Sequence, residues 1–165
     1  MPPQDKARAA FLGLLARRER REIVLRIPNF CMAECSKAFA EIIYSNNRSQ
    51  ENARDEYGSH VEALLNLVSK QRRGFVESYA LQRKHLVNIE EIFEAQYRIK
   101  SPNRTVGMLS GLDGLIISMA TALLRWYGPD DVIVATGDDW LARVCNQNRP
   151  TFPKAFNIFT DPVPG

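Results

Sequence analysis

Three acidic residues, Glu34, Asp113 and Asp138, belong to separate segments that the predicted elements of this chain would bring to one place. Carboxylates from distant segments repel one another unless a cation lies between them, and Mg²⁺ or Mn²⁺ is the ion that such hard oxygen ligands prefer. A divalent ion in such a position can activate water and neutralise charge on a phosphodiester. The three residues therefore indicate metal-dependent hydrolysis of a nucleic-acid backbone.

A helix predicted over 110–126 leads directly into a strand predicted over 132–135. From Asp113 to Tyr127 the chain descends about 21 Å as helix, at about 1.5 Å per residue. The strand and its extension to Asp138 climb back about 20 Å, at about 3.3 Å per residue. Both acids should therefore lie at the carboxyl edge of the sheet, where open α/β sheets bind ligands.

Glu34 reaches the same edge through another pair of elements. The β-branched segment 23–27 predicts a mostly buried strand, which Pro28 closes. A helix predicted over 29–44 follows at once and carries Glu34 in its opening turns, with an apolar face on the opposite side. The three carboxylates thus converge on one edge.

Each acid also has a structural explanation. Ser110 and Asp113 fit the Ser-x-x-Asp capping box before an apolar run. Asp138 or Asp139 fits a helix N-cap, and Glu34 fits a solvated surface position. Considered one by one, the residues favour these structural roles; considered together at one edge, they favour a site.

The remaining elements favour an α/β fold with a parallel sheet in one domain covering 1–165. The run 132–135 lacks alternation, which is typical of a strand covered on both faces. The other expected elements are an amphipathic helix over 5–18, a polar loop over 45–59, helices over 61–71 and 76–97, a loop over 101–107, a short helix over 140–145 and a final strand over 155–159.

Composition excludes several protein classes. The 165 residues are 45% hydrophobic and 25% charged, as in ordinary soluble proteins, and no apolar run is long enough to span a membrane. The first residues do not resemble a secretory signal, so a cytoplasmic location is expected. Three cysteines, an odd number, are expected to be reduced thiols in core packing, although the spacing of Cys31 and Cys35 also fits a soft metal site.

A net charge of +3 permits a polyanionic partner without requiring one. Basic residues gather in two clusters, each of which could follow a phosphate backbone or simply be solvated. The clusters are Arg17, Arg18, Arg20 and Arg21, and then Lys70, Arg72 and Arg73. The two histidines, His60 and His85, are not expected to be catalytic, and His85 lies beside an apolar helical stripe.

Several motifs resemble the PIN-domain family, which includes ribonucleases that act as toxins of bacterial toxin-antitoxin pairs. Residues 27–34 look like the family's strand, Ile-Pro pair and helix carrying the second acid. Residues 112–120 look like its helix in which Asp precedes aliphatic and Ala positions. Residues 134–141 look like its strand ending in Thr-x-Asp, and 157–162 resemble its closing strand.

The resemblance implies a three-layer α/β/α sandwich with a parallel sheet, here helix-rich, with a helical insertion at about 45–106. It implies a ribonuclease that hydrolyses RNA with Mg²⁺ or Mn²⁺, in the cytoplasm, with an antitoxin protein as a partner and a homodimer allowed. By similarity, the residues have these roles: Glu34, Asp113 and Asp138 as catalytic metal ligands, Asp139 as an auxiliary metal-site acid, and Thr136 or Ser110 as a hydroxyl that orients them.

One departure separates this chain from the family pattern, which opens with a central strand ending in Asp. The sequence starts instead at the helix that normally comes later, so the fold is expected to be N-terminally incomplete, and Asp5 does not replace the missing acid. A start assigned too late, a strand supplied by another chain, or a degenerate member would each explain this. Two alternative functions remain: a catalytically degenerate PIN-like module that binds nucleic acid or protein, and an all-helical interaction protein.

Overall fold

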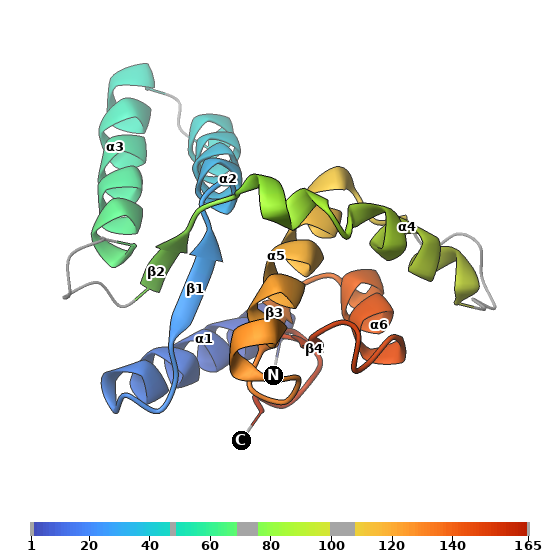
Figure 1. The fold of residues 1–165 in the computed structure, drawn as a ribbon. Helices are drawn as coiled ribbons and strands as arrows, with labels where there is room; N and C mark the ends of the chain where they lie inside the picture. The colour runs from blue at the N-terminus through green and yellow to red at the C-terminus, as the bar shows by residue number, and fades with distance from the viewer. Residues whose placement is uncertain (1, 47–48, 69–75, 100–107, 165) are drawn as a thin grey trace. The chain divides into compact units, whose positions relative to one another are not determined.

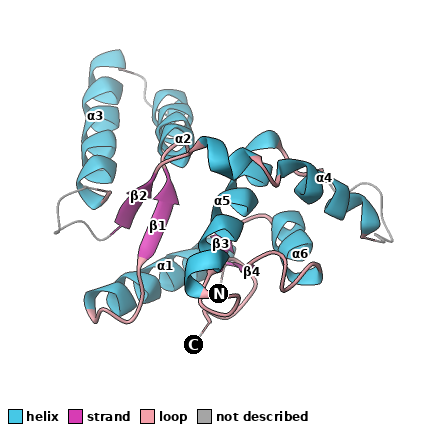
Figure 2. Cartoon of the chain, viewed as in Figure 1, coloured by secondary structure: helices cyan, strands magenta, loops and turns pink. Residues whose placement is uncertain are grey.

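The computed structural model describes residues 2–46, 49–68, 76–99 and 108–164, which form a helix-rich mixed α/β chain with short parallel strands (Figures 1 and 2). Its contacts group into two compact units. We call Leu14–Leu81 the N-terminal unit, and Gln82–Gly165 together with Met1–Gly13 the C-terminal unit. No helix in the described ranges combines the length and apolar character needed to cross a bilayer. The single domain expected for 1–165 stays a prediction.

The N-terminal unit is built around one parallel strand pair. Its elements after α1 (Pro3–Glu19) are β1 (Leu25–Pro28), α2 (Cys31–Asn46), α3 (Gln50–Leu67) and β2 (Val76–Tyr79). Strands β1 and β2 pair in register from Leu25 with Val76 to Pro28 with Tyr79. Parallel strands need a long crossover between them, and α2 and α3, which pack on each other, belong to it (Figure 1).

Helix α1 ends in a Schellman motif. The N–H of Glu22 donates to the carbonyl of Arg17 at 3.0 Å, and the N–H of Arg21 donates to that of Arg18 at 3.0 Å. This geometry places Arg21 in the left-handed region, with φ 60°, where glycine is the usual residue.

The C-terminal unit alternates helices with a second parallel pair. Its elements are a 3₁₀ turn η1 (Arg83–Leu86), then α4 (Ile89–Arg98), α5 (Gly111–Tyr127), β3 (Ile133–Thr136), α6 (Asp139–Gln147) and β4 (Lys154–Asn157). Strands β3 and β4 pair from Ile133 with Lys154 to Thr136 with Asn157. Gly128, with φ 93°, ends α5 and turns the chain toward β3.

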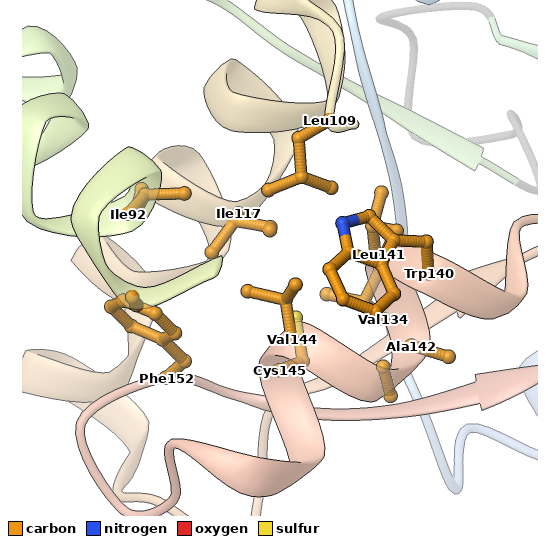
Figure 3. Close-up of a cluster of buried hydrophobic side chains, with 12 residues drawn as sticks. Ile92, Leu109, Ile117, Val134, Trp140, Leu141, Ala142, Val144, Cys145 and Phe152 are labelled. Carbon is orange, nitrogen blue, oxygen red and sulfur yellow. The ribbon is translucent and has the colours of Figure 1, made fainter. Parts of the chain in front are cut away.

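The core of this unit is formed by buried side chains of α4, α5, β3, α6 and β4. Ile92 of α4, Ile117 of α5, Val134 of β3 and Val144 of α6 meet there, and Figure 3 shows them in one cluster with Trp140. Because all these side chains are buried, the N-terminal ends of α5 and α6 are held in place by packing from several directions.

Strand β3 is covered on one face, and the expectation of cover on both faces is wrong for the described residues. Val134 is buried, whereas Ile133 and Ala135 on the opposite face are exposed. The β-branched run therefore reflects strand propensity more than burial on both sides. Strand β1 is similarly half-buried rather than mostly buried.

Two further predictions are corrected. The polar loop expected over 45–59 is largely helix, since α3 begins at Gln50, and the helix expected over 76–97 is interrupted by β2 and η1. Val76–Tyr79 becomes a strand because β1 supplies its hydrogen-bond partners, which local periodicity cannot reveal. The loop expected over 101–107 lies outside the described residues.

The buried face of α2 is also displaced from the expected one. Ile43 is buried, whereas Ile42 and Ala38, expected inside, are exposed. The other elements agree with their predictions to within a few residues: the helices over 5–18, 29–44, 110–126 and 140–145 and the strands over 23–27, 132–135 and 155–159.

Candidate functional site

Asp138 lies where β3 ends and α6 begins, and it is the N-cap of α6. Its Oδ1 accepts hydrogen bonds from the backbone N–H groups of Trp140, at 2.6 Å, and Leu141, at 3.1 Å. Its own N–H donates to Oγ1 of Thr136 at 3.0 Å. The Thr136 hydroxyl therefore contacts the backbone of the acid that it was expected to orient.

Asp139 is joined to the end of β4 through the buried side chain of Asn157. The amide Nδ2 of Asn157 donates to Oδ1 of Asp139 at 2.6 Å, and the backbone N–H of Asn157 donates to Oδ2 of Asp161 at 2.8 Å. Asp161 was not among the predicted site residues. Its position just after the last strand could have suggested it, since the carboxyl ends of parallel strands share one edge.

Asp113 closes a reciprocal capping box with Ser110 at the start of α5. Its Oδ2 accepts from the backbone N–H of Ser110 at 2.8 Å and from the Ser110 hydroxyl at 2.7 Å. The backbone N–H of Asp113 donates back to that hydroxyl oxygen at 3.2 Å. The structural role that the sequence suggests for this pair is confirmed, and the contact between Ser110 and Asp113 is direct.

The starts of α5 and α6 meet at one buried side chain, Gln96 of α4. Its Oε1 accepts from the backbone N–H of Leu109 at 3.0 Å and from the indole N–H of Trp140 at 3.4 Å. Leu109 directly precedes the N-cap of α5, and Trp140 lies in the first turn of α6. Asp113 and Asp138 are therefore at the same end of the C-terminal unit, at two helix N-termini whose dipoles favour negative charge.

In Asp113, Asp138 and Asp139, one carboxylate oxygen accepts the hydrogen bonds that stabilise the fold. Oδ1 of Asp138, Oδ1 of Asp139 and Oδ2 of Asp113 accept the bonds described above. Within the described residues, the second oxygen of each accepts none. These second carboxylate oxygens are hard ligands of the kind that Mg²⁺ and Mn²⁺ prefer.

Across the part of the chain that the structure describes, no three His, Cys, Asp or Glu side chains form a group that could hold a metal ion. Glu34 is an exposed residue in the first turn of α2 and belongs to the N-terminal unit. The shared site of Glu34, Asp113 and Asp138 therefore stays a prediction, as does the auxiliary role of Asp139.

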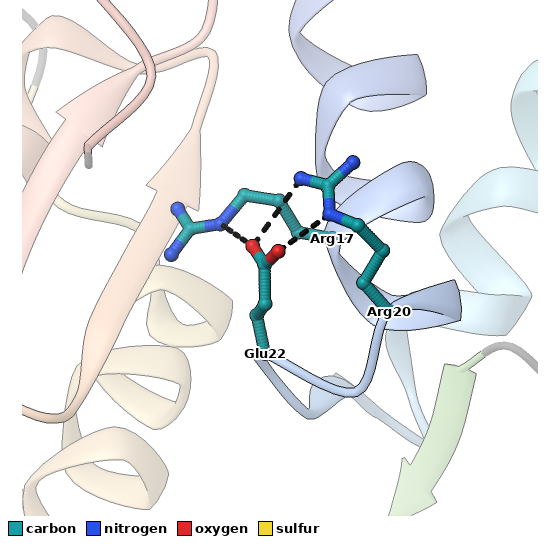
Figure 4. A network of polar contacts seen from close by, with 3 residues as sticks. All are labelled: Arg17, Arg20 and Glu22. Carbon is teal, nitrogen blue, oxygen red and sulfur yellow. Dashed lines mark hydrogen bonds and ion pairs between the residues drawn. The ribbon is translucent and has the colours of Figure 1, made fainter.

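The first basic cluster is partly neutralised by a neighbouring acid. Glu22 accepts from Nε of Arg17 at 3.3 Å and from Nε of Arg20 at 2.5 Å (Figure 4). The hydrogen bond from Arg20 is the main reason why the pKa of Glu22 is lowered. Half of this cluster is therefore paired, which weakens it as a phosphate-binding patch. The cluster of Lys70, Arg72 and Arg73 lies outside the described residues.

All three cysteines are free thiols, as expected. Cys145 is fully buried in the core, and burial raises its pKa to about 12. Cys31 and Cys35 are half-buried, and burial, with the charge of Glu34, raises the pKa of Cys35. The environments of Cys35 and Cys145 therefore disfavour a reactive thiolate.

Comparison with protein-family models, with curated proteins and with solved structures finds no match for this chain.

Proposed function

We propose that this chain is a metal-dependent ribonuclease of the PIN-domain type, with a three-layer α/β/α architecture, that hydrolyses RNA phosphodiester bonds. The observation that carries the proposal is the position of Asp113 and Asp138, which cap two helices that begin against the same Gln96 oxygen. Asp138 also follows a parallel strand at its carboxyl end, where ligands of α/β proteins bind.

In the proposed site, Asp113, Asp138 and Glu34 would hold Mg²⁺ or Mn²⁺, with Asp139 assisting. A bound divalent ion would supply charge neutralisation at the phosphodiester and activation of water. The chain's own contribution is orientation: the Ser110 hydroxyl fixes the carboxylate of Asp113, and the N–H groups of α6 fix that of Asp138. In the same proposal, the cellular role is that of a toxin whose partner is an antitoxin protein.

Asn substitutions remove the charge of each acid while keeping the helix starts. Asp138→Asn leaves a good N-cap residue on α6, and in Asp113→Asn the amide oxygen can still accept from the Ser110 N–H. Cleavage of single-stranded RNA in Mn²⁺ should fall to background in both variants, and Mn²⁺ binding measured by calorimetry should weaken. Asp55→Asn, at an exposed position of α3, is the matched control and should cleave like the wild type. Cleavage that survives both substitutions would contradict the proposal.

A second candidate is a catalytically degenerate module that binds nucleic acid without a metal. It is favoured by the absence, among the described residues, of any group of three metal-ligating side chains. This candidate predicts salt-dependent RNA binding that is unchanged by EDTA, with no cleavage in Mn²⁺ or Mg²⁺. Metal-dependent cleavage by the purified wild-type chain would exclude it.

A further inference from the structure

Trp126 is the most solvent-exposed of the large apolar side chains in the described residues, with 79% of its surface accessible. It lies in the last turn of α5, in the C-terminal unit. Indole side chains usually contribute their large apolar area to a core or an interface. An indole left this exposed, on a helix whose other face is buried in the core, is a candidate contact surface for a ligand with a flat apolar face.

The indole borders a hollow of about 230 Å³ that is also lined by three polar or basic residues, Lys84, Asn88 and Arg125, and by Ala122. Within the described ranges, no acidic residue lines this hollow. Among the described residues, neither Lys84 nor Arg125 forms an ion pair. Two cations and an amide beside an exposed indole therefore complement an anion that also carries an aromatic ring.

The two cations are held together by the packing of η1 on α5. His85, the neighbour of Lys84, is fully buried, and its backbone carbonyl accepts a hydrogen bond from the hydroxyl of Ser118 on α5. Arg125 lies two helical turns further along the same helix. The arrangement of Lys84 opposite Arg125 thus belongs to the folded unit, and binding does not have to create it.

A second hollow of about 390 Å³ adjoins the first, because Asn88 and Arg125 line both. Glu91 lines the second hollow, together with Pro129, Pro150 and Thr151. Its carboxylate would repel a phosphate there and would leave the smaller hollow as the favoured place for the anion. The larger hollow suits a neutral part of the same ligand, such as a sugar or a base.

We propose that Lys84, Asn88, Arg125 and Trp126 form a binding surface for single-stranded nucleic acid. A base stacks on the indole, a backbone phosphate lies between the lysine and the guanidinium, and the Asn88 amide hydrogen-bonds to the sugar or base. Stacking on an aromatic side chain requires an unpaired base, so a single strand fits and a duplex does not.

The proposal deepens the nucleic-acid function proposed above and rests on it for the class of ligand. Trp126 and Asp113 are at opposite ends of α5, roughly 20 Å apart at 1.5 Å per residue. The surface would therefore hold a part of the strand away from the reacting phosphodiester. Binding here needs no divalent ion, which separates it experimentally from the acidic site.

The test uses the full chain in EDTA with a fluorescent single-stranded RNA of about 12 nucleotides, a length that covers one typical binding site. Trp126→Ala should weaken binding by about five- to 150-fold, the range expected for loss of one stacked base. Tyr97→Ala is the matched control, because Tyr97 is also highly exposed (73%), on α4. It should leave affinity unchanged.

Charge is tested by the salt dependence of the same titration. The slope of log affinity against log salt is negative for a phosphate-binding surface. Lys84→Gln and Arg125→Gln should each make it less steep by roughly 0.7, the contribution of one single-strand phosphate contact. Lys154→Gln, an exposed position on β4, should leave the slope unchanged. A duplex of the same sequence should compete weakly, and vesicles containing phosphatidylserine should not compete.

Equal affinities of the Trp126→Ala and Tyr97→Ala variants, or equal competition by the duplex, would overturn the surface. Binding to anionic vesicles but not to RNA would assign it to a membrane. Asp55→Asn, at an exposed position of α3, should bind RNA like the wild type in EDTA. If Trp126→Ala weakens RNA binding but the wild type does not cleave RNA, the nuclease proposal alone is refuted. If the wild type cleaves RNA and Trp126→Ala leaves RNA binding unchanged, the proposed binding surface alone is refuted.

Discussion

The buried amide of Asn157 donates a hydrogen bond from Nδ2 to Oδ1 of Asp139, 2.6 Å away, and so joins the end of β4 to the first turn of α6. Its backbone N–H donates to Oδ2 of Asp161 at 2.8 Å, so this one residue donates to two carboxylates. The amide is uncharged and offers both a donor and an acceptor: Nδ2 donates to Asp139, and Oδ1 accepts from the backbone N–H of Phe159 at 2.8 Å.

Asn157→Asp should destabilise the chain at neutral pH, by about 1–3 kcal/mol, because it removes the donor to Asp139 and places a negative charge at a buried position in contact with two carboxylates. Urea unfolding monitored by circular dichroism measures the change. Protonation should restore part of the loss as the pH falls toward about 4. Asn66→Asp, at an exposed position of α3, carries the same charge change and should cost little. Equal unfolding midpoints for the two variants would contradict this role of Asn157.

Gln96→Leu should cost about 2 kcal/mol or more, because it leaves the N–H groups of Leu109 and Trp140 buried without their acceptor. The near-ultraviolet circular dichroism of the buried indole should change as well. Gln96→Glu has a side chain of similar size and keeps an oxygen acceptor in the same position. Comparing it with Gln96→Leu therefore separates the loss of the hydrogen bonds from a change in side-chain packing. A Leu variant as stable as the wild type would show that Gln96 does not hold the two helix starts together.

Gly114→Ala tests the close approach of α4 and α5. A methyl group at Gly114 would lie 2.8 Å from the Phe93 ring, closer than real contacts allow, so the variant should lose about 1–3 kcal/mol despite the better helix propensity of Ala. Gly111→Ala, in the same helix with nothing within 4 Å, should be neutral or stabilising by up to about 1 kcal/mol. Thermal unfolding that ranks the two variants in the opposite order would contradict the packing.

Arg21→Gly should stabilise the chain by roughly 0.5–1 kcal/mol, because glycine adopts the left-handed backbone at the end of α1 without the steric cost of a side chain. Arg18→Gly, inside the same helix, should instead lose about 1 kcal/mol from helix propensity. The midpoints of urea unfolding of the two variants should therefore move in opposite directions. A loss of stability in Arg21→Gly would mean that the side chain of Arg21 contributes more than its backbone strain costs.

His85 should make stability fall in mild acid. Burial, helped by the charge of Lys84, lowers the pKa of His85, and the Gln82 N–H donates to its Nδ1 at 3.0 Å, which requires an unprotonated nitrogen there. The unfolded chain therefore binds the proton more readily, so stability is full above the unfolded pKa of about 6.5 and is lost as pH falls below it, down to the folded pKa.

The check is a series of urea unfolding midpoints between about pH 7.5 and 5, a range that covers this titration. In His85→Gln the side-chain oxygen can still accept from the Gln82 N–H, but nothing titrates, so its midpoint should fall less than that of the wild type. Parallel curves for the two proteins would rule out His85 as the source of the acid sensitivity.

Local chemistry in the sequence determined several of these features. Ser110 and Asp113 predict the capping box that starts α5, Gly128 predicts its end, and Asp138 predicts the start of α6. Each of these signals acts within one turn of chain, so neighbouring residues are sufficient to specify them.

Tertiary structure alone decided the features whose partners are distant in sequence. Val76–Tyr79 is a strand because β1 pairs with it, and Gln96 receives bonds from two helix starts that the chain reaches only later. The link from Asn157 to Asp139 and the exposed indole of Trp126 depend in the same way on which faces pack together. Hydrogen bonds and burial between distant segments leave no local period, so the sequence specifies these relationships only through the folded chain.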